Sequence, residues 1–201
     1  YRYDPGTLGD KTTTLEGFKF FGKINWNISD VHKLTVRHAY TFAEETDFRA
    51  SNRGTINFAN NGIYFPSTTN TSAIELNSLF GNKSSNNLIL GYTSVRDDRD
   101  PIGSPFPAVR IEDGEGTISF GSEPFSTANA LDQDIFTITN NFKLYKGAHT
   151  ITIGTHNEFM SVNNVFVRQN FGSYVYENLP GEVKSPYQRF IDGDPADNYD
   201  R

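Results

Sequence analysis

The stretch from Leu131 to Phe159 constrains the fold more than any other, because apolar and polar residues alternate along two long runs on either side of a turn. In each run most apolar residues share one parity, namely Phe136, Ile138, Phe142 and Leu144 in the first and Ile151, Ile153 and Phe159 in the second. Between the runs lies the glycine-containing turn Tyr145-Lys146-Gly147-Ala148. A period of two residues predicts half-buried β-strands, and the tight turn predicts that they pair as an antiparallel hairpin.

The two runs are also long. Strands of globular proteins usually contain about 5–6 residues, whereas a tilted strand that crosses a bilayer needs roughly 9–11. Each run here is long enough for the second case. Strand length therefore allows a membrane-spanning sheet, in which residues that face lipid alternate with residues that face the interior.

Two further segments show the same alternation, so we predict three long hairpins, at about residues 16–43, 72–96 and 131–165. The segments outside them, at about 44–71, 97–130 and 166–201, are polar, and we expect them to be long outer loops. Soluble domains rarely contain structureless connections longer than about 12–15 residues, whereas outer-membrane barrels have short turns at one end and long loops at the other. The predicted fold is all-β, an antiparallel up-and-down meander of long hairpins that is part of a transmembrane β-barrel, with residues 1–201 as one partial barrel domain.

Composition narrows the function classes. The formal net charge of -6 argues against a nucleic-acid partner. The absence of cysteine excludes disulfides and thiolate metal sites. No run approaches the roughly 18 apolar residues of a transmembrane helix, but alternating barrel strands produce no such run. The chain begins with Tyr1 rather than methionine, and we expect it to be an internal piece of a longer protein.

No group of residues predicts catalysis. His156 and Glu158 share a strand face, but two ligands are too few for a metal site, and a hydrogen-bonding pair is the simpler interpretation. The acidic stretches 97–100 and 112–115 offer oxygen ligands without the spacing of a calcium loop, and solvated loops are the simpler interpretation. Neither a G-x-S-x-G nucleophile motif nor a phosphate loop is present. We therefore expect no catalytic residues, no metal and no cofactor.

Ligand binding suits the predicted outer loops better, because aromatic rings stand there among asparagine, serine, glycine and arginine. Aromatic planes beside amide and hydroxyl groups are suited to glycans or peptides. The candidate ligand-binding residues are Tyr64, Phe65, Phe106, Phe120, Tyr174 and Tyr176, and Phe125 belongs to the same class. The alternative for each ring is that it packs the loops against one another.

Two other sets of residues fit a barrel wall. Aromatic residues near strand ends are placed as in the girdles at membrane–water interfaces, although an ordinary core is the alternative; they are Trp26, Tyr40, Tyr92 and Tyr145. Charged residues on the other strand face are expected on the inner wall of the barrel; they are Lys19, Lys23, Arg37, Glu75, Lys143 and Glu158.

Several stretches resemble the barrels of TonB-dependent outer-membrane receptors, in particular the Oar-like receptors of Bacteroidota, which are related to SusC-type importers. These stretches are GKINWNISDVHKLTVRHAYTFAE at 22–44, LDQDIFTITNNF at 131–142, YKGAHTITIGTHNEF at 145–159, VRQNFGSY at 167–174, and PIGSPFPAVRI and ISFGSEPFS in the second loop. The resemblance implies a barrel of about 22 strands around a plug domain. It also implies a place in the cell outer membrane, contact with outer-membrane lipid, and import of a substrate energised by the TonB complex through the plug. The plug, the TonB box and the closing strand are missing from these residues, the substrate (a glycan or peptide) is not specified, and a surface lipoprotein stays open as a further partner.

Two alternatives remain at this point. A soluble extracellular β-sandwich that binds carbohydrate would have shorter strands packed in two facing sheets. A secreted β-rich hydrolase is disfavoured, because no nucleophile or metal motif is present. Six strands cannot close a membrane barrel, since the smallest have about eight. We therefore expect unpaired sheet edges, and aggregation of these residues alone in water.

Overall fold

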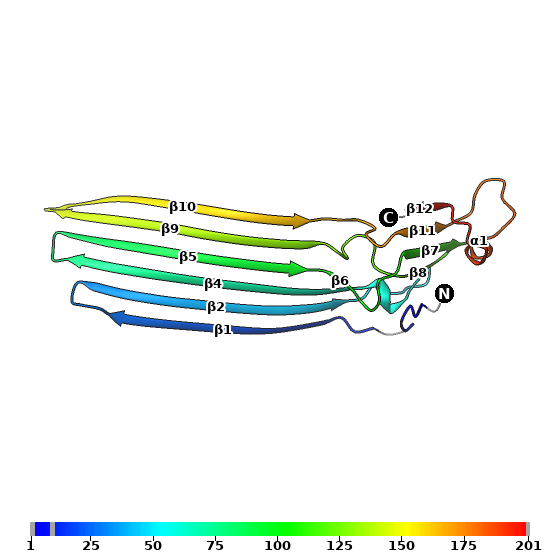
Figure 1. The fold of residues 1–201 in the computed structure, drawn as a ribbon, viewed down its shortest axis with the longest axis horizontal. Coiled ribbons are helices and arrows are strands. Elements are labelled where there is room, and N and C mark those ends of the chain that lie inside the picture. The colour runs from blue at the N-terminus through cyan, green and yellow to red at the C-terminus, as the bar shows by residue number, and fades with distance from the viewer. Residues whose placement is uncertain (1–2, 9–10, 200–201) are drawn as a thin grey trace.

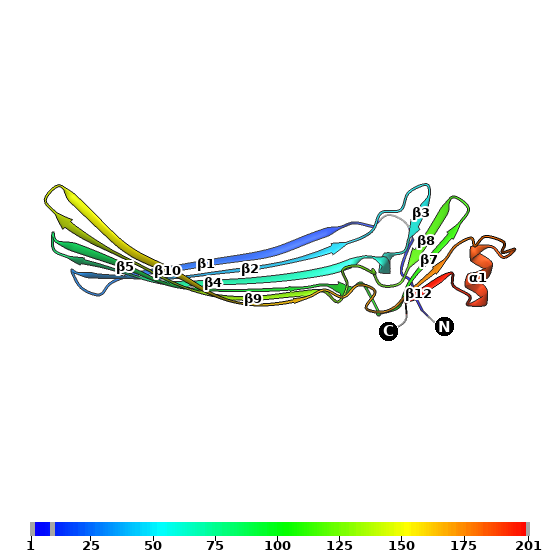
Figure 2. The same ribbon diagram turned by 90° about the horizontal axis from the view of Figure 1, so that it is seen from above.

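The computed structural model describes residues 3–8 and 11–199 and arranges them in two β-sheets placed end to end (Figure 1). A large sheet contains the long strands, and its tight turns lie together at one end of the molecule (Figure 1). A small sheet with one short helix lies at the opposite end. Seen from above, the long strands curve together as one twisted layer (Figure 2).

The large sheet consists of six long strands that are neighbours both in sequence and in space. They are β1 (Thr14–Asn27), β2 (His32–Asp47), β4 (Ile63–Phe80), β5 (Ser84–Asp98), β9 (Ala130–Lys146) and β10 (His149–Val165). Each neighbouring pair is antiparallel, and the two-residue β6 (Asp100–Pro101) adds to β4. The predicted antiparallel up-and-down meander of long hairpins is confirmed.

One side of the large sheet, the apolar face, collects the apolar half of the alternating pattern. Cross-strand partners lie on the same side of a sheet, so the register places Ile24, Val36, Ile74, Leu90 and Ile138 in one row. Neighbouring rows on this face add Trp26, Leu34, Tyr40, Leu76, Leu88, Tyr92, Phe136 and Phe159. The alternation of single strands thus becomes a continuous apolar band across the sheet.

The other side, the polar face, carries mainly small, hydroxyl and charged residues, although Phe21 and Met160 also lie on it. The six charged residues expected on an inner wall, Lys19, Lys23, Arg37, Glu75, Lys143 and Glu158, share this face by register. Arg37 pairs with Glu75 at 3.6 Å, and the same carboxylate accepts hydrogen bonds from Asn77 and Asn87. Tyr145 also lies here, with its hydroxyl 3.0 Å from the Ser85 hydroxyl. The register therefore places Tyr145 on the face of Lys143, opposite to the face that carries the other three predicted girdle residues, Trp26, Tyr40 and Tyr92.

No other element of residues 3–8 and 11–199 packs over the apolar face. Ile24 is 70% exposed and Trp26 is 61% exposed, and among the described residues the long strands contact chiefly their neighbours in the sheet. The sheet is open, since within residues 3–8 and 11–199 β1 pairs only with β2 and β10 only with β9. In the same part of the chain, no helix is both long enough and apolar enough to cross a membrane.

The small sheet is built from all three segments predicted to be loops. Its strands are β3 (Thr55–Asn57), β7 (Ala108–Asp113), β8 (Gly116–Phe120), β11 (Ser173–Tyr176) and β12 (Asp197–Tyr199), in the order β12-β11-β7-β8-β3. The pairs β11–β7 and β3–β8 are parallel. The 3-10 turn η1 (Ala59–Asn61) follows β3, and the helix α1 (Pro186–Asp192) precedes β12.

The boundaries of the predicted loops therefore need correction. β2 continues to Asp47, β4 already begins at Ile63, and β9 begins at Ala130, so the hairpins extend into the segments predicted as loops 44–71 and 97–130. The alternation fades in these extensions because polar residues such as Thr68 and Asp98 take positions on the apolar face. Backbone pairing continues regardless, because it does not depend on the polarity of the side chains.

The small sheet has its own hydrophobic core on one face. Val109, Ile111 and Tyr176 are buried, and partly buried rings and aliphatic groups pack around them, namely Phe106, Ile118, Phe120, Tyr174 and Phe190. The helix α1 supplies Phe190, and it lies on the side of the small sheet away from the long strands (Figure 2). The other face of the small sheet is left for the connecting segments, and a cleft forms there.

Candidate binding cleft

Four of the six predicted ligand-binding residues lie in the core of the small sheet. Phe106, Phe120, Tyr174 and Tyr176 all belong to the cluster around Val109, and Tyr3 stacks on Phe106 with ring centroids 3.9 Å apart. Burial, together with the nearby Asp194 carboxylate, raises the pKa of the Tyr176 hydroxyl. Packing between loop segments, the alternative to ligand binding, accounts for all four rings.

The other two predicted residues, Tyr64 and Phe65, lie on β4 and have partners of their own. The Tyr64 hydroxyl donates a hydrogen bond of 2.5 Å to the Glu44 carboxylate. The Arg99 guanidinium lies 4.9 Å from the centroid of the Phe65 ring, a cation–π contact. The structure therefore does not gather the six candidates into one site.

A cleft of about 270 Å³ opens on the face of the small sheet opposite its core. By register, Ser119, Arg110, Val175 and Asp197 form a row on this face, because Val109 and Ile111 point to the core. All four line the cleft. The remaining walls come from connecting segments and include Arg49, Asn61, Phe125, Arg168, Gln169 and Ser173.

Glu123 holds together the segment that forms one wall of this cleft. Its side chain is 1% exposed. One carboxylate oxygen accepts a hydrogen bond from Arg49, and the other accepts backbone N–H bonds from Phe125 at 2.9 Å and Ser126 at 2.5 Å. The Thr127 hydroxyl donates to the Glu123 carbonyl. A buried carboxylate needs this full set of partners, so Glu123 fixes both the turn after it and the position of Arg49.

That turn presents Phe125 to two arginine residues. The guanidinium carbon of Arg49 lies 5.7 Å from the ring centroid, and that of Arg168 lies 5.0 Å from it. Phe125 remains 44% exposed. Cation–π contacts of this kind orient a guanidinium without neutralising its charge. The cleft therefore has one wall that is both aromatic and positively charged.

Only part of this cleft could be predicted from the sequence. Phe125 belongs to the class of loop aromatics, but Arg49 and Glu123 are separated by 74 positions and carry no common motif. The local signal that exists is Glu123 followed by the Ser126 and Thr127 hydroxyls, a pattern in which a carboxylate can bond to the backbone of the next turn. It predicts a turn and gives no indication of Arg49 or Arg168.

The other candidate groups keep simple roles. The His156 Nδ1 atom lies 2.7 Å from the Thr139 hydroxyl across the strand pair. In the acidic loop, Glu112 pairs with Arg110 at 3.0 Å. Burial and the Asp98 charge raise the pKa of Asp100. Among residues 3–8 and 11–199 no group of three or more His, Cys, Asp or Glu side chains is placed to hold a metal ion.

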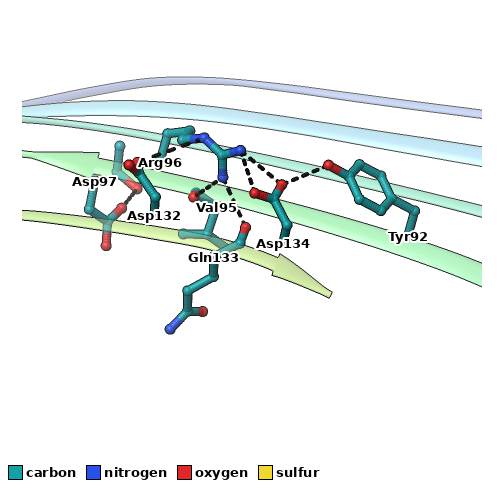
Figure 3. A network of polar contacts seen from close by, with 8 residues as sticks. Tyr92, Val95, Arg96, Asp97, Asp132, Gln133 and Asp134 are labelled. Atoms are coloured by element: carbon teal, nitrogen blue, oxygen red, sulfur yellow. Dashed lines mark hydrogen bonds and ion pairs between the residues drawn. The ribbon is translucent and has the colours of Figure 1, made fainter. Parts of the chain in front are cut away.

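A polar network interrupts the apolar band on β5 and β9, toward the small-sheet ends of these strands (Figure 3). The Arg96 guanidinium donates two hydrogen bonds of 2.8 Å to Asp134, and the Tyr92 hydroxyl donates one of 2.6 Å to the same carboxylate. Asp132, the direct cross-strand partner of Arg96, lies 3.7 Å from its guanidinium. All four residues are on the apolar face by register. The character of this face thus changes from hydrocarbon to paired charge within a few residues.

Comparison of the chain with protein-family models, with curated proteins and with solved structures found no match.

Proposed function

We propose that this chain is part of a TonB-dependent outer-membrane receptor that binds a substrate and imports it across the outer membrane. The observation that supports this most is the uncovered apolar band on strands of 14 to 18 residues. Strands of about 9–11 residues already span a bilayer when tilted. In this proposal the additional strand length would extend the small sheet beyond the membrane surface.

Lipid is the solvent that suits this band. Moving one large aliphatic or aromatic side chain out of water contributes about 1.5–3 kcal/mol. The band includes many such side chains that the protein leaves exposed, for example Phe18, Ile24, Trp26, Ile153 and Phe159. In a bilayer they are covered, whereas in water they would form an exposed apolar patch of the kind that promotes association.

The polarity of the two faces also agrees with a barrel wall. The apolar face would contact outer-membrane lipid, with the hydroxyl of Tyr92 and its partners at the interface. The polar face, with Arg37, Glu75 and their amide partners, would line the interior. In this proposal the unpaired edges of β1 and β10 continue into further strands, because an open edge is not stable in lipid.

The arrangement of the sheets gives less support to a soluble carbohydrate-binding sandwich. Such a fold needs two sheets packed face to face with shorter strands. Here the two sheets lie end to end, and residues 130–165 form two paired strands of 17 residues each (Figure 1).

Localisation in native cells tests the proposal. We expect the full-length protein in the outer-membrane fraction, with recovery that requires detergent. Protease added to intact cells should cut the exposed loop around Val183, which is fully exposed, and leave β9 and β10 intact. Recovery of the protein in the soluble or secreted fraction would contradict the proposal and favour the carbohydrate-binding alternative.

A further inference from the structure

The cleft on the small sheet contains an arginine, Arg168, that has no carboxylate partner among residues 3–8 and 11–199. Three arginines line it, Arg49, Arg110 and Arg168, against the single carboxylate of Asp197. Arg49 is committed to Glu123 and Arg110 is paired with Glu112. For Arg168, no carboxylate of the described residues lies within ion-pair distance.

Arg168 is nevertheless held in place. Its guanidinium lies 5.0 Å from the centroid of Phe125, and the turn that carries Phe125 is fixed by the bonds to Glu123. The neighbouring Gln169 has a φ of 53°, and its backbone N–H donates to the Pro124 carbonyl at 2.6 Å. A planar, oriented guanidinium with free N–H donors matches the geometry of a carboxylate. Arg49 and Arg110 already have carboxylate partners, so Arg168 is the arginine of the cleft left to pair with a ligand.

From these contacts we infer that the cleft binds a carboxylated sugar residue. Arg168 pairs with its carboxylate, and the exposed part of the Phe125 ring contacts its C–H groups. The hydroxyl, amide and carboxylate groups of Ser119, Gln169 and Asp197 supply partners for a polyhydroxylated ring. The inference rests on the proposed function, because it names the class of substrate that the receptor would capture.

Size and backbone pairing favour a sugar over an acidic peptide. A volume of about 270 Å³ accommodates one ring-sized group and little more. Peptides usually gain affinity by adding a strand to a free sheet edge. Most of the floor of this cleft comes from β7, β8 and β11, each of which is already paired with a strand on both sides. β12, which contributes Asp197, is the edge strand among the described residues, so strand addition would be limited to its outer edge.

Calorimetric titration of the purified full-length protein in detergent tests the inference. The probes are trigalacturonate, the neutral trigalactose, and triglutamate as an acidic peptide. We expect trigalacturonate to bind, its affinity to fall with added salt, and the neutral sugar to bind at least about tenfold more weakly, because a charge-assisted pair is lost. Binding of triglutamate in place of trigalacturonate, or equal binding of the two sugars, would overturn the inference.

Variants at Arg168 give the matched comparison. Arg168→Gln should weaken trigalacturonate binding about 10- to 100-fold, and Arg168→Lys should restore part of the loss, since it keeps the charge and loses the planar pairing. Arg53→Gln makes the same charge change at an exposed arginine that does not line the cleft, and it should leave the affinity unchanged. Unchanged binding by Arg168→Gln would refute the role of this residue.

Failure of this inference can be separated from failure of the proposed function. Binding is measured on purified protein and localisation on native cells. A protein that is found in the outer membrane and does not bind trigalacturonate would refute the inference alone. A secreted protein that binds trigalacturonate through Arg168 would refute the import proposal and leave the ligand class in place.

Discussion

Ile111 of the small sheet is 3% exposed, whereas Ile24 of the large sheet is 70% exposed, although both are isoleucines on β-strands in the same chain. The small sheet covers its apolar face with α1 and with rings from the connecting segments. The large sheet carries a wider apolar face and covers it with nothing from the described residues. Apolar and polar residues thus alternate in both sheets, but the apolar face of the small sheet is buried in protein and that of the large sheet is exposed.

The comparison shows that an alternating pattern identifies a face without identifying what covers that face. A face that stays dry inside the protein and a face that meets lipid have similar sequences. What distinguishes them here is strand length, since β7 and β8 have six and five residues and the six long strands of the large sheet have 14 to 18. The following predictions test this distinction, from the largest expected effect to the smallest.

Removal of amphiphile should have the largest effect. When the full-length protein is diluted from detergent into water, we expect the large sheet to lose its soluble, ordered state and the protein to aggregate, because the apolar band becomes exposed. Light scattering together with hydrogen exchange of β9 and β10 would measure this. A monodisperse protein with protected β9 and β10 amides in water would show that the band is covered by protein instead.

Truncation of Ile111 should strongly destabilise the small sheet. Ile111→Ala removes buried methyl groups and leaves a cavity beside Val109 and Tyr176, which costs about 2–5 kcal/mol. Hydrogen exchange should show faster exchange for β7 and β8 amides, with little change in β9 and β10. Val183→Ala is the control, because Val183 is fully exposed. Equal effects at both positions would refute an independent core.

A charge on the apolar face should be costly in lipid. Ile24→Arg places a cation in the aliphatic row of the band, and we expect it to lower the free energy of unfolding in lipid vesicles by about 2–4 kcal/mol. Asn25→Arg makes a similar change one position away, on the polar face, where it loses only the exposed hydrogen bond with Thr35. Its cost should stay below about 1 kcal/mol. If both variants are equally stable in vesicles, the apolar face does not contact lipid.

The smallest effect should come from acid acting on α1. The hydrogen bond from Lys184, with Nζ 2.7 Å from the carboxylate, lowers the pKa of Asp192 below its usual 3.8, and Gln188 contributes in the same direction. Stabilisation by a carboxylate with a lowered pKa is present above pH 3.8 and is lost as the pH falls through the lowered value. The protection of the α1 amides, measured as their exchange rate relative to that of an unfolded chain at the same pH, should therefore fall below pH 3.8 in the natural protein. Asp192→Asn should remove this dependence, and persistence of the acid effect in that variant would assign it to another group.

The large sheet was largely predictable from the sequence, and the small sheet was not. Alternation along β9 and β10 is long enough to specify strand, face and partner at once. In β7 and β8 the alternation covers only Val109 and Ile111 on one side and Ile118 and Phe120 on the other, around the turn at Gly114, whose φ is 63°. The acidic residues of that turn led to the prediction of a solvated loop, whereas the structure contains a short hairpin there.

The binding cleft was less predictable still, for a physical reason. Its parts meet only because parallel pairs join β3 to β8 and β7 to β11. Such pairs have no turn between them that marks the partners in sequence. Phe125 belonged to a predicted class, but Arg49, Glu123 and Arg168 come together through tertiary contacts alone.

The small sheet joins segments that are far apart in the chain, and this has a consequence for the order of folding. Each long hairpin closes across a short turn, so it can form with a low entropic cost. The pairs Thr55–Thr117 and Ala108–Ser173 instead bridge whole hairpins, and contacts of such sequence separation form slowly. The small sheet should therefore assemble last, and only when all three hairpins are aligned. A completed small sheet would then require that the long strands have already paired in the correct register. The cleft would therefore be the last part of the protein to become able to bind a ligand.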